Sequence, residues 1–395
     1  MADAVLALNA GSSSLKFAVY RNEFGMIGPV STGEIEGIGT APHFVARDGG
    51  GLPVIEKRFP SATFAILLSE LLLWVDHHLG GDRLVAVGHR VVHGGRDYTA
   101  PVRLTDGVLA ALEALTPLAP LHQPHSLAPM RAITALRPGL PQAACFDTAF
   151  HHTMPAVATR FALPREYEDE GVRHYGFHGL SYEFIARRLR EVAPVLARGR
   201  VIVAHLGNGA SLCALRAGVS VDTTMTFTAL DGLVMGTRCG ALDPGVILYM
   251  LQQRNMTPME VMHVLYEKSG LLGVSGLSGD MRVLMASVLP RAREAIDLFV
   301  FRIARETAAL AASLGGIDGF VFTGGIGEHA PEIRAAICER LRWLGVVPAT
   351  KPTGSRISAP ESRVEVHVIP TDENAMIGQH TVDILACDIA SGRSA

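Results

Sequence analysis

The stretch that decides the fold is VLALNAGSSSLKFAVY, residues 5–20. Residues 5–8 form a short apolar run, which is typical of a buried strand. Leu15, Phe17 and Val19 then alternate with other residues, and this alternation is the periodicity of a second strand. We therefore predict a β-hairpin whose tip is the polar turn between these two segments.

The turn of this hairpin combines small polar residues with a lysine. Gly11 allows the backbone to turn tightly and to approach a ligand closely. Amide, hydroxyl and ammonium groups at the tip would then face a phosphate, although an ordinary hairpin turn is an equally good interpretation of these letters alone. The Walker order GxxxxGK[ST] is absent, and a strand follows the turn instead of a helix. The candidate phosphate-binding residues here are Asn9, Ser12, Ser14 and Lys16.

Composition places the chain among compact soluble proteins, and its length allows two domains. It has 395 residues, of which 48% are hydrophobic and 18% charged, and its formal net charge is −3. This charge gives no reason to expect nucleic acid or a membrane surface as a partner. The five cysteines are scattered without a CxxC pair. Because no signal peptide or membrane-spanning segment is visible either, we expect a reducing, cytoplasmic setting.

A strand followed by glycines lies in LVAVGHRVVHGG, residues 84–95. Arg90 near the end of this strand could clamp a carboxylate or a phosphate with two parallel hydrogen bonds, although a surface arginine is the simpler interpretation of Arg90 alone. His89 and His93 have the HxxxH spacing of a helical zinc site. Because a strand precedes them and glycines follow, we do not expect a helix or a metal there.

Two further segments place polar residues where a pocket could form. Residues 117–130, PLAPLHQPHSLAPM, are predicted to be an irregular loop because prolines interrupt helices and central strands. This loop contains Leu121 and His122. Residues 143–146 form a strand, and Asp147 follows at its carboxyl end, where a carboxylate could bind Mg²⁺ or act as a base. The alternative is that Asp147 only caps the next segment.

The strand–turn–strand pattern of the opening residues occurs again in VIVAHLGNGASLCAL, residues 201–215. The glycine turn contains Gly207, Asn208 and Gly209, and His205 precedes it. Two such hairpins, far apart in the chain, suggest two copies of one domain around a nucleotide. Because hairpins recur in many β proteins, the repeat alone is only suggestive.

Glycine-rich segments with arginines and acids occupy much of the remaining chain. HYGFHGLSYEF, residues 174–184, opens an amphipathic helix that we expect Ser181 to cap, with His178 just before it. Arg238 lies in a Gly-rich loop. In residues 319–334 we expect a strand, then the GGIG turn, then a helix that begins near Pro331. In this order the amide groups at the start of the helix can face a phosphate. The other candidates are Asp280 and Arg282 in a loop, Gly325 and Gly327 in the GGIG turn, and Glu373 after the last strand.

Together these residues include the parts needed for phosphoryl transfer. Glycine turns can bind phosphates, acids can bind a metal ion, and arginines can stabilise charge on the transferred group. A nucleotide-switched binding protein would need the turns and the acids but has no use for a clamp of two arginines. Arg90 and Arg238 therefore favour a kinase. No Ser/His/Asp or Cys/His order typical of a covalent hydrolase stands out.

The chain resembles the acetate kinase (acetokinase) family in a series of motifs that occur in order across nearly all of it. They read LNAGSSSLKF, GHRVVHGG, FDTAFHHTMP, YGFHG, HLGNGAS, MGTR and FTGGIGE. The resemblance implies an α/β fold with two duplicated ribonuclease H-like domains, of the actin, Hsp70 and sugar kinase type, and a nucleotide cleft between them. The expected domains are an N-terminal one, residues 1–150 plus 375–395, and a C-terminal nucleotide-binding one, residues 151–374.

The resemblance also implies an activity and a role for each matching residue. The implied reaction is ATP-dependent, reversible phosphorylation of acetate to acetyl phosphate by direct transfer, with Mg²⁺ or alternatively Mn²⁺, in a homodimer. A kinase for propionate or another short-chain acyl group is the alternative. Catalysis is assigned to Arg90, Asp147, His178 and Arg238, and the substrate pocket to Arg90, Val92, Leu121, His122, Phe177 and Ala229. Nucleotide and phosphate contacts are assigned to Asn9, Ser12, Ser14, Lys16, His205, Gly207, Asn208, Gly209, Asp280, Arg282, Gly325 and Gly327, and the metal ion to Asn9, Asp147 and Glu373.

The chain departs from the family pattern mainly near the expected acyl pocket. LHNPPN is LHQPHS here, GTSH is GLSY, and FTPLEG is FTALDG, which puts Ala229 where the family has a proline. TRSGD is TRCGA, and GEN is GEH. The residues with chemical roles are retained, so these changes bear on the acyl preference more than on the reaction type.

Overall fold

The structure is a computed structural model that describes residues 2–11, 13–23 and 25–390. Its contacts divide the chain into two compact units, Met1–Phe150 with Asp372–Ala395, and His151–Thr371. The chain thus returns to the first unit before the expected residue 375, because Glu373 is already the first residue of the last helix, α14.

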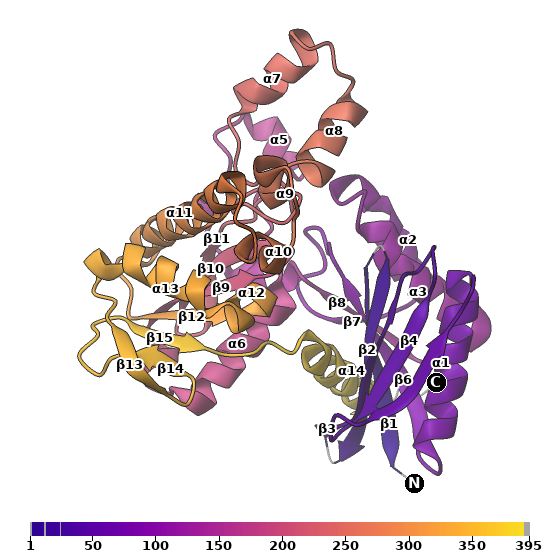
Figure 1. The fold of residues 1–395 in the computed structure, drawn as a ribbon. Helices are drawn as coiled ribbons and strands as arrows, with labels where there is room; N and C mark the ends of the chain where they lie inside the picture. Colours follow the sequence, from indigo (N-terminus) through magenta and orange to yellow (C-terminus); the bar gives the residue numbers. More distant parts are fainter. Residues whose placement is uncertain (1, 12, 24, 391–395) are drawn as a thin grey trace. The chain divides into compact units, whose positions relative to one another are not determined.

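The first unit is built on an eight-stranded mixed sheet (Figure 1). The opening residues form the predicted hairpin, since β1 and β2 pair antiparallel with Val5 opposite Tyr20. On its other side β1 is parallel to β6, and β6 is parallel to β8. The order is β5-β4-β3-β2-β1-β6-β8-β7, with β1 (Asp3–Ala10), β2 (Ser14–Glu23), β3 (Met26–Glu36), β4 (His43–Asp48), β5 (Pro53–Arg58), β6 (Arg83–Val91), β7 (Val102–Arg103) and β8 (Gln142–Phe146).

Helices cover both faces of this sheet. On one face, the buried side chains Leu8 and Phe17 pack with Leu68 and Leu71 of α1 in a single apolar core. On the other face, a Cβ atom at Gly88 would lie 2.1 Å from Thr381 of α14, so α14 packs directly on the β6 backbone. The helices of this unit are α1 (Phe64–Leu79), α2 (Asp106–Ala114), α3 (Gln123–Leu136) and α14 (Glu373–Ala390), with short 3₁₀ turns η1 (Thr116–Leu118) and, across the unit boundary, η2 (Ala149–Thr153).

The expectation of an irregular loop at residues 117–130 is wrong in its second half. Helix α3 begins at Gln123, and its first turn contains Pro124. A proline is tolerated there because the first N–H groups of a helix have no intrahelical acceptor. Pro129 lies farther inside the same helix and is buried.

The second unit has a seven-stranded sheet of the same central design. Its order is β11-β10-β9-β12-β15-β14-β13, with β9 (Arg200–Leu206), β10 (Ala210–Arg216), β11 (Val219–Thr223), β12 (Gly319–Thr323), β13 (Pro348–Thr353), β14 (Arg356–Ser358) and β15 (Glu365–Val368). The five strands β11-β10-β9-β12-β15 repeat the antiparallel and parallel pairings of β3-β2-β1-β6-β8. The predicted duplication of an α/β domain is therefore confirmed, and the β9–β10 turn is the counterpart of the β1–β2 turn.

Helices of the second unit pack against this sheet, and the longest, α11, contacts β9, β10 and β11. They are α4 (Ala156–Thr159), α5 (Arg165–Asp169), α6 (Gly179–Val192), α7 (Pro244–Gln252), α8 (Pro258–Glu267), α9 (Gly270–Ser275), α10 (Met281–Met285), α11 (Pro290–Leu314), α12 (Gly324–His329) and α13 (Pro331–Arg340), with 3₁₀ turns η3 (Leu196–Arg198) and η4 (Arg342–Leu344). Among the described residues, no helix has the length and apolar character needed to cross a membrane.

Two helix starts differ from expectation. The N-cap position of α6 is occupied by His178 and not by Ser181, which lies inside the first turn. The GGIG segment precedes helix α13, which begins at Pro331 as expected, but it also lies in a short helix of its own, α12, which begins at Gly324. Gly324 has a φ of +76°, so a residue with a side chain would be strained at this sharp strand-to-helix turn.

Candidate active site

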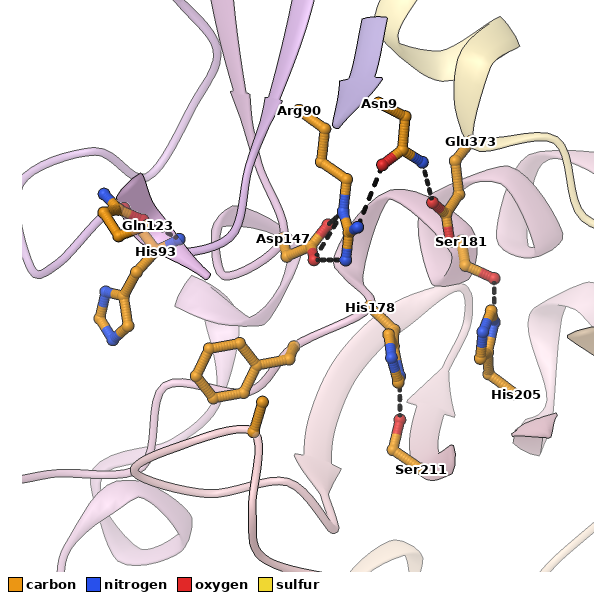
Figure 2. A network of polar contacts seen from close by, with 12 residues as sticks. Asn9, Arg90, His93, Gln123, Asp147, His178, Ser181, His205, Ser211 and Glu373 are labelled. Atoms are coloured by element: carbon orange, nitrogen blue, oxygen red, sulfur yellow. Dashed lines mark hydrogen bonds and ion pairs between the residues drawn. The ribbon is translucent and has the colours of Figure 1, made fainter. Parts of the chain in front are cut away.

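Four predicted residues of the first unit form one polar network at the carboxyl ends of neighbouring strands. Asn9 lies in β1, Arg90 in β6 and Asp147 directly after β8, and because these strands are parallel neighbours their ends meet at one edge. Arg90 donates from Nε and Nη2 to Asp147 over distances of 2.5 to 3.1 Å, and from Nη1 to Asn9 Oδ1 at 3.1 Å. Asn9 Nδ2 donates to Glu373 Oε2 at 2.9 Å. Figure 2 shows Arg90 between Asn9 and Asp147.

The charges in this network support one another. Burial raises the pKa of Asp147 above its ordinary value, and the guanidinium of Arg90 opposes that rise. For Arg90, burial disfavours the charged form, but the carboxylates of Asp147 and Glu373 outweigh burial and raise its pKa. Arg90 is therefore a permanent cation with a fixed orientation, and its side chain remains 21% exposed.

A glutamine orders the segment that follows Arg90. Gln123 is fully buried, and its side-chain amide pairs with both backbone groups of His93, receiving a hydrogen bond from the N–H at 3.2 Å and donating to the carbonyl at 3.0 Å. Val92, which precedes His93, is buried, while Leu121 and His122 at the start of α3 are partly exposed. The predicted pocket residues of the first unit thus lie on two segments that Gln123 joins.

The remaining candidates of the first hairpin are only partly described. Ser12 lies outside the described residues. Ser14 begins β2, and its carbonyl oxygen accepts a hydrogen bond from the N–H of Gly11 at 2.8 Å, which closes the turn. Lys16 is paired with Asn9 across the hairpin, so their side chains share a face of the sheet.

Two stacked histidines are the central candidates of the second unit. His178 has a φ of 58°, and its ring stacks on that of His205 with 4.4 Å between centroids. His178 Nδ1 lies 2.8 Å from Ser211 Oγ, and His205 Nδ1 lies 2.8 Å from Ser181 Oγ. Both rings are therefore fixed by stacking and by a serine (Figure 2).

Arg238 approaches the same glycine turn as His178. A Cβ atom at Gly209 would lie 2.8 Å from Arg238 Nη2 and 3.2 Å from His178 Nε2, so both nitrogen atoms face this turn, and only glycine leaves room for them. Arg238 Nη1 donates to the backbone carbonyl of Ala229 at 2.5 Å. Phe177 is buried, and its carbonyl accepts a hydrogen bond from His151 Nε2 at 2.9 Å.

A cavity of about 760 Å³ in the second unit brings together five of the predicted nucleotide residues. These are Gly207, Asn208, Asp280, Arg282 and Gly325. Asp280 is the N-cap of α10 and pairs with Arg282, so the two residues begin a helix and do not lie in a plain loop. Gly327 is buried inside α12 and does not line the cavity. Apolar side chains that the sequence did not single out, Met281, Met285 and Ile326, form part of the wall.

Comparisons with known proteins show the family of this chain. The model of the Acetokinase family matches residues 4–379. The chain belongs to the acetokinase family. Its relative, the acetate kinase of Rhodopseudomonas palustris, is 54% identical over 389 residues, which cover 96% of this chain and 98% of that protein.

Solved structures of an acetate kinase and of a propionate kinase share the fold over nearly the whole chain. The crystal structure of Porphyromonas gingivalis acetate kinase has a TM-score of 0.84 at 37% identity and covers 97% of this chain and 100% of that chain. A propionate kinase from Francisella tularensis has a TM-score of 0.87 at 35% identity, with 96% and 98% covered.

Three residues that the sequence analysis did not select contact or order candidate residues within their own units. Gln123 orders the segment after Arg90, Ser211 contacts His178, and the Tyr182 hydroxyl group contacts Ser211. The sequence carried a signal for two of these residues, because Gln123 and Tyr182 stand where LHQP and GLSY depart from the family pattern. Their hydrogen-bond partners, however, are distant in sequence and become visible only in the fold.

Proposed function

We propose that this chain is an acetate kinase, which reversibly transfers the γ-phosphoryl group of ATP to acetate to form acetyl phosphate and ADP. The observation that supports this most strongly is the network of Asn9, Arg90, Asp147 and Glu373, in which a fixed arginine cation lies at the meeting point of three parallel strand ends. Membership of the acetokinase family supports the same reaction.

The proposed reaction forms one bond and breaks one bond at phosphorus. A carboxylate oxygen of acetate bonds to the γ-phosphorus, while the bond from this phosphorus to the bridging oxygen breaks and ADP leaves with the electron pair. Acetate is already ionised at neutral pH, so no general base has to remove a proton. Asp147 accordingly serves by orienting Arg90, to which it is paired, and not by accepting a proton.

Cationic and N–H donors supply the stabilisation that this reaction needs. In phosphoryl transfer, charge gathers on the equatorial oxygens of the transferred group, and fixed donors there lower the barrier. Arg90 is fixed by Asp147, Arg238 by the carbonyl of Ala229, and His178 by Ser211. Direct transfer requires all three donors to act on one phosphoryl group.

The first unit's network offers donors that suit Mg²⁺. Among the described residues, no group of three or more His, Cys, Asp and Glu side chains is placed to bind a metal ion by itself. Mg²⁺ is usually bound by one or two carboxylates together with substrate phosphates and water, and it prefers oxygen ligands. The side-chain oxygens of Asn9, Asp147 and Glu373 fit this requirement. A bound Mg²⁺ ion would neutralise charge on the ATP phosphates, and Mn²⁺ could replace it.

The nucleotide is proposed to bind in the cavity of the second unit. Its apolar wall, which includes Met281 and Ile326, suits a base, while Asp280 and Asn208 offer polar groups to a ribose and phosphates. Of the predicted phosphate-binding residues in the first unit, Ser14 and Lys16 are proposed to contact the phosphates of the nucleotide.

Acetyl phosphate formation tests the proposed function. The purified protein is incubated with MgATP and acetate, and acetyl phosphate is trapped as the hydroxamate. We expect hydroxamate that depends on acetate, on ATP and on Mg²⁺. ATP hydrolysis without hydroxamate would contradict the proposal and would favour the alternative, a nucleotide-switched protein of the actin and Hsp70 kind. Propionate in place of acetate tests the second candidate, a propionate kinase, which Ala229 favours because it leaves more space than a proline.

We also propose a homodimer in the cytoplasm. Helix α7 exposes Leu248 and Tyr249, which are 52% and 54% accessible, and Met259 of α8 is exposed as well. A contact with a second copy of the chain would bury these apolar side chains. No disulfide joins any of the five cysteines, which agrees with a reducing compartment. Light scattering after size-exclusion chromatography would distinguish a dimer from a monomer.

A further inference from the structure

Tyr182 connects a buried hydroxyl group to the ring of His178 through a single serine. The Tyr182 hydroxyl contacts Ser211 Oγ, and Ser211 Oγ lies 2.8 Å from His178 Nδ1. Tyr182 belongs to the first turn of α6 and Ser211 to β10, and both side chains are fully buried. Figure 2 shows Ser211 pointing toward the His178 ring.

The direction of these hydrogen bonds follows from burial. Within the described part of the chain, Ser211 Oγ is the hydrogen-bond partner of the Tyr182 hydroxyl, and a buried donor without an acceptor costs about 1–3 kcal/mol. Burial raises the pKa of Tyr182 well above its ordinary value, so the phenol keeps its proton. Tyr182 therefore donates to Ser211, and the proton of Ser211 is available to His178 Nδ1.

We propose that Ser211, anchored by Tyr182, is a positioning residue that fixes His178 as the tautomer with its proton on Nε2. A neutral imidazole has one N–H group, and when Nδ1 accepts a hydrogen bond that group is at Nε2. Nε2 is the nitrogen atom that faces Gly209 together with Arg238 Nη2. The inference rests on the proposed function, in which this N–H donates to an oxygen of the transferred phosphoryl group.

The orientation of the ring is fixed independently of the proton. His178 has left-handed backbone geometry, which is uncommon for residues other than glycine, and it lies at the start of α6. Stacking on His205 then sets the plane of the ring. Ser211 therefore adds what backbone and stacking do not determine, namely which nitrogen atom bears the proton.

Nitrogen-15 NMR of the histidine side chains tests the proposal directly. Spectra are recorded on the full chain without substrates, and the His178 signals are assigned with a His178→Gln variant. We expect the Nε2–H tautomer alone in the wild type and a mixture of tautomers in Ser211→Ala. A wild-type His178 with its proton on Nδ1 would overturn the proposal.

Kinetics of acetyl phosphate formation give a second, independent measurement. In Ser211→Ala and Tyr182→Phe, we expect kcat to fall about tenfold or more with little change in the KM for acetate, because a donor to the transition state is misplaced. Tyr175→Phe is the matched control, since it removes another buried hydroxyl, which donates to the Gly171 carbonyl at 2.8 Å. Unchanged kcat in both variants, or an equal fall in the control, would overturn the proposal.

The two proposals can fail separately. The tautomer is measured without turnover, so a wild-type protein that forms no acetyl phosphate would contradict the proposed function, and the NMR spectrum would still decide the position of the proton on His178.

Discussion

Arg90 and Arg238 are fixed by different partners, a buried carboxylate and a backbone carbonyl. We expect Arg90→Ala or Arg238→Ala to lower kcat by at least about 100-fold, because losing one fixed donor to transition-state charge costs roughly 3 kcal/mol. Arg→Lys should restore little, since an ammonium group lacks the planar fork of donors. The measurement is acetyl phosphate formation at saturating substrates.

Arg200→Ala is the control for these variants. Arg200 is also paired with a carboxylate, that of Asp318. It is the first residue of β9, at the end of the strand away from the β9–β10 glycine turn, and its side chain is 39% exposed. Its removal should leave kcat near the wild-type value. Near-normal turnover in Arg238→Ala would instead show that the assignment of Arg238 is wrong.

At position 229 we expect a smaller effect, on the choice between acetate and propionate. A proline at this position would add ring carbons to the pocket wall while keeping the carbonyl that Arg238 contacts. One methylene buried against apolar walls is worth about 0.8 kcal/mol, or roughly fourfold in kcat/KM. We therefore expect Ala229→Pro to lower kcat/KM for propionate selectively, with acetate little changed. A parallel change for both substrates would show that residue 229 does not select the acyl length.

For single residues, the sequence was sufficient to predict which of them stand at the end of a strand. Arg90 and Asp147 could be placed at strand ends from the sequence, and the structure adds that β1, β6 and β8 are parallel neighbours, whose ends meet at one edge of the sheet. Tyr182 could not be predicted, because its role depends on a contact with Ser211, which is far away in the chain.

Among the elements, α14 has the greatest influence on the site of the first unit. Its first residue, Glu373, accepts a hydrogen bond from Asn9, and the helix packs on β6 where Gly88 has no side chain. In Gly88→Ala the added Cβ would lie 2.7 Å from Ile377 Cγ2, as well as too close to Thr381.

We expect Gly88→Ala to lower the free energy of unfolding by about 1–3 kcal/mol, as overpacking does in other cores. Chemical denaturation of the variant and the wild type measures this. Gly28→Ala is the matched control, because Gly28 is also a strand glycine but has no heavy atom within 4 Å of its added Cβ. Equal losses in the two variants would mean that the contact between β6 and α14 is not responsible.

Helix α3 illustrates why elements were harder to predict than strand ends. Prolines at residues 117–130 indicated a loop, yet Pro124 occupies a position where a helix needs no N–H donor. The location of a helix start depends on which residues cap it and on the core that it covers, and neither was visible from composition.

For the whole molecule, buried neutral histidines predict a loss of stability in acid. Burial lowers the pKa of His89 and of His151 to about 4. The unfolded chain binds these protons near pH 6.5, so their stabilising contribution is complete above that pH and is lost as pH falls toward 4. Each histidine should cost about 2 kcal/mol between pH 7 and pH 5.

The measurement is urea unfolding at pH 7 and pH 5. His89→Gln keeps a polar side chain next to Gln142, the present partner of His89, but cannot take up a proton. We expect this variant to lose less stability than the wild type over the same interval. An identical loss in both proteins would show that His89 does not contribute to the pH dependence.

The duplication of the fold could be predicted because the two glycine turns follow equivalent strands, β1 and β9. The family resemblance implied that the chain returns to the first unit at residue 375, and the contacts of the structure divide the chain at Asp372, next to the start of α14.

The central claim is that this chain moves a phosphoryl group from ATP to acetate, and the ratio of products tests it most directly. Phosphorus-31 NMR of the protein with MgATP and acetate resolves ADP, acetyl phosphate and inorganic phosphate in one sample. We predict one acetyl phosphate for each ADP, with inorganic phosphate formed only by later hydrolysis of the product. ADP that accumulates with inorganic phosphate and without acetyl phosphate would contradict the account.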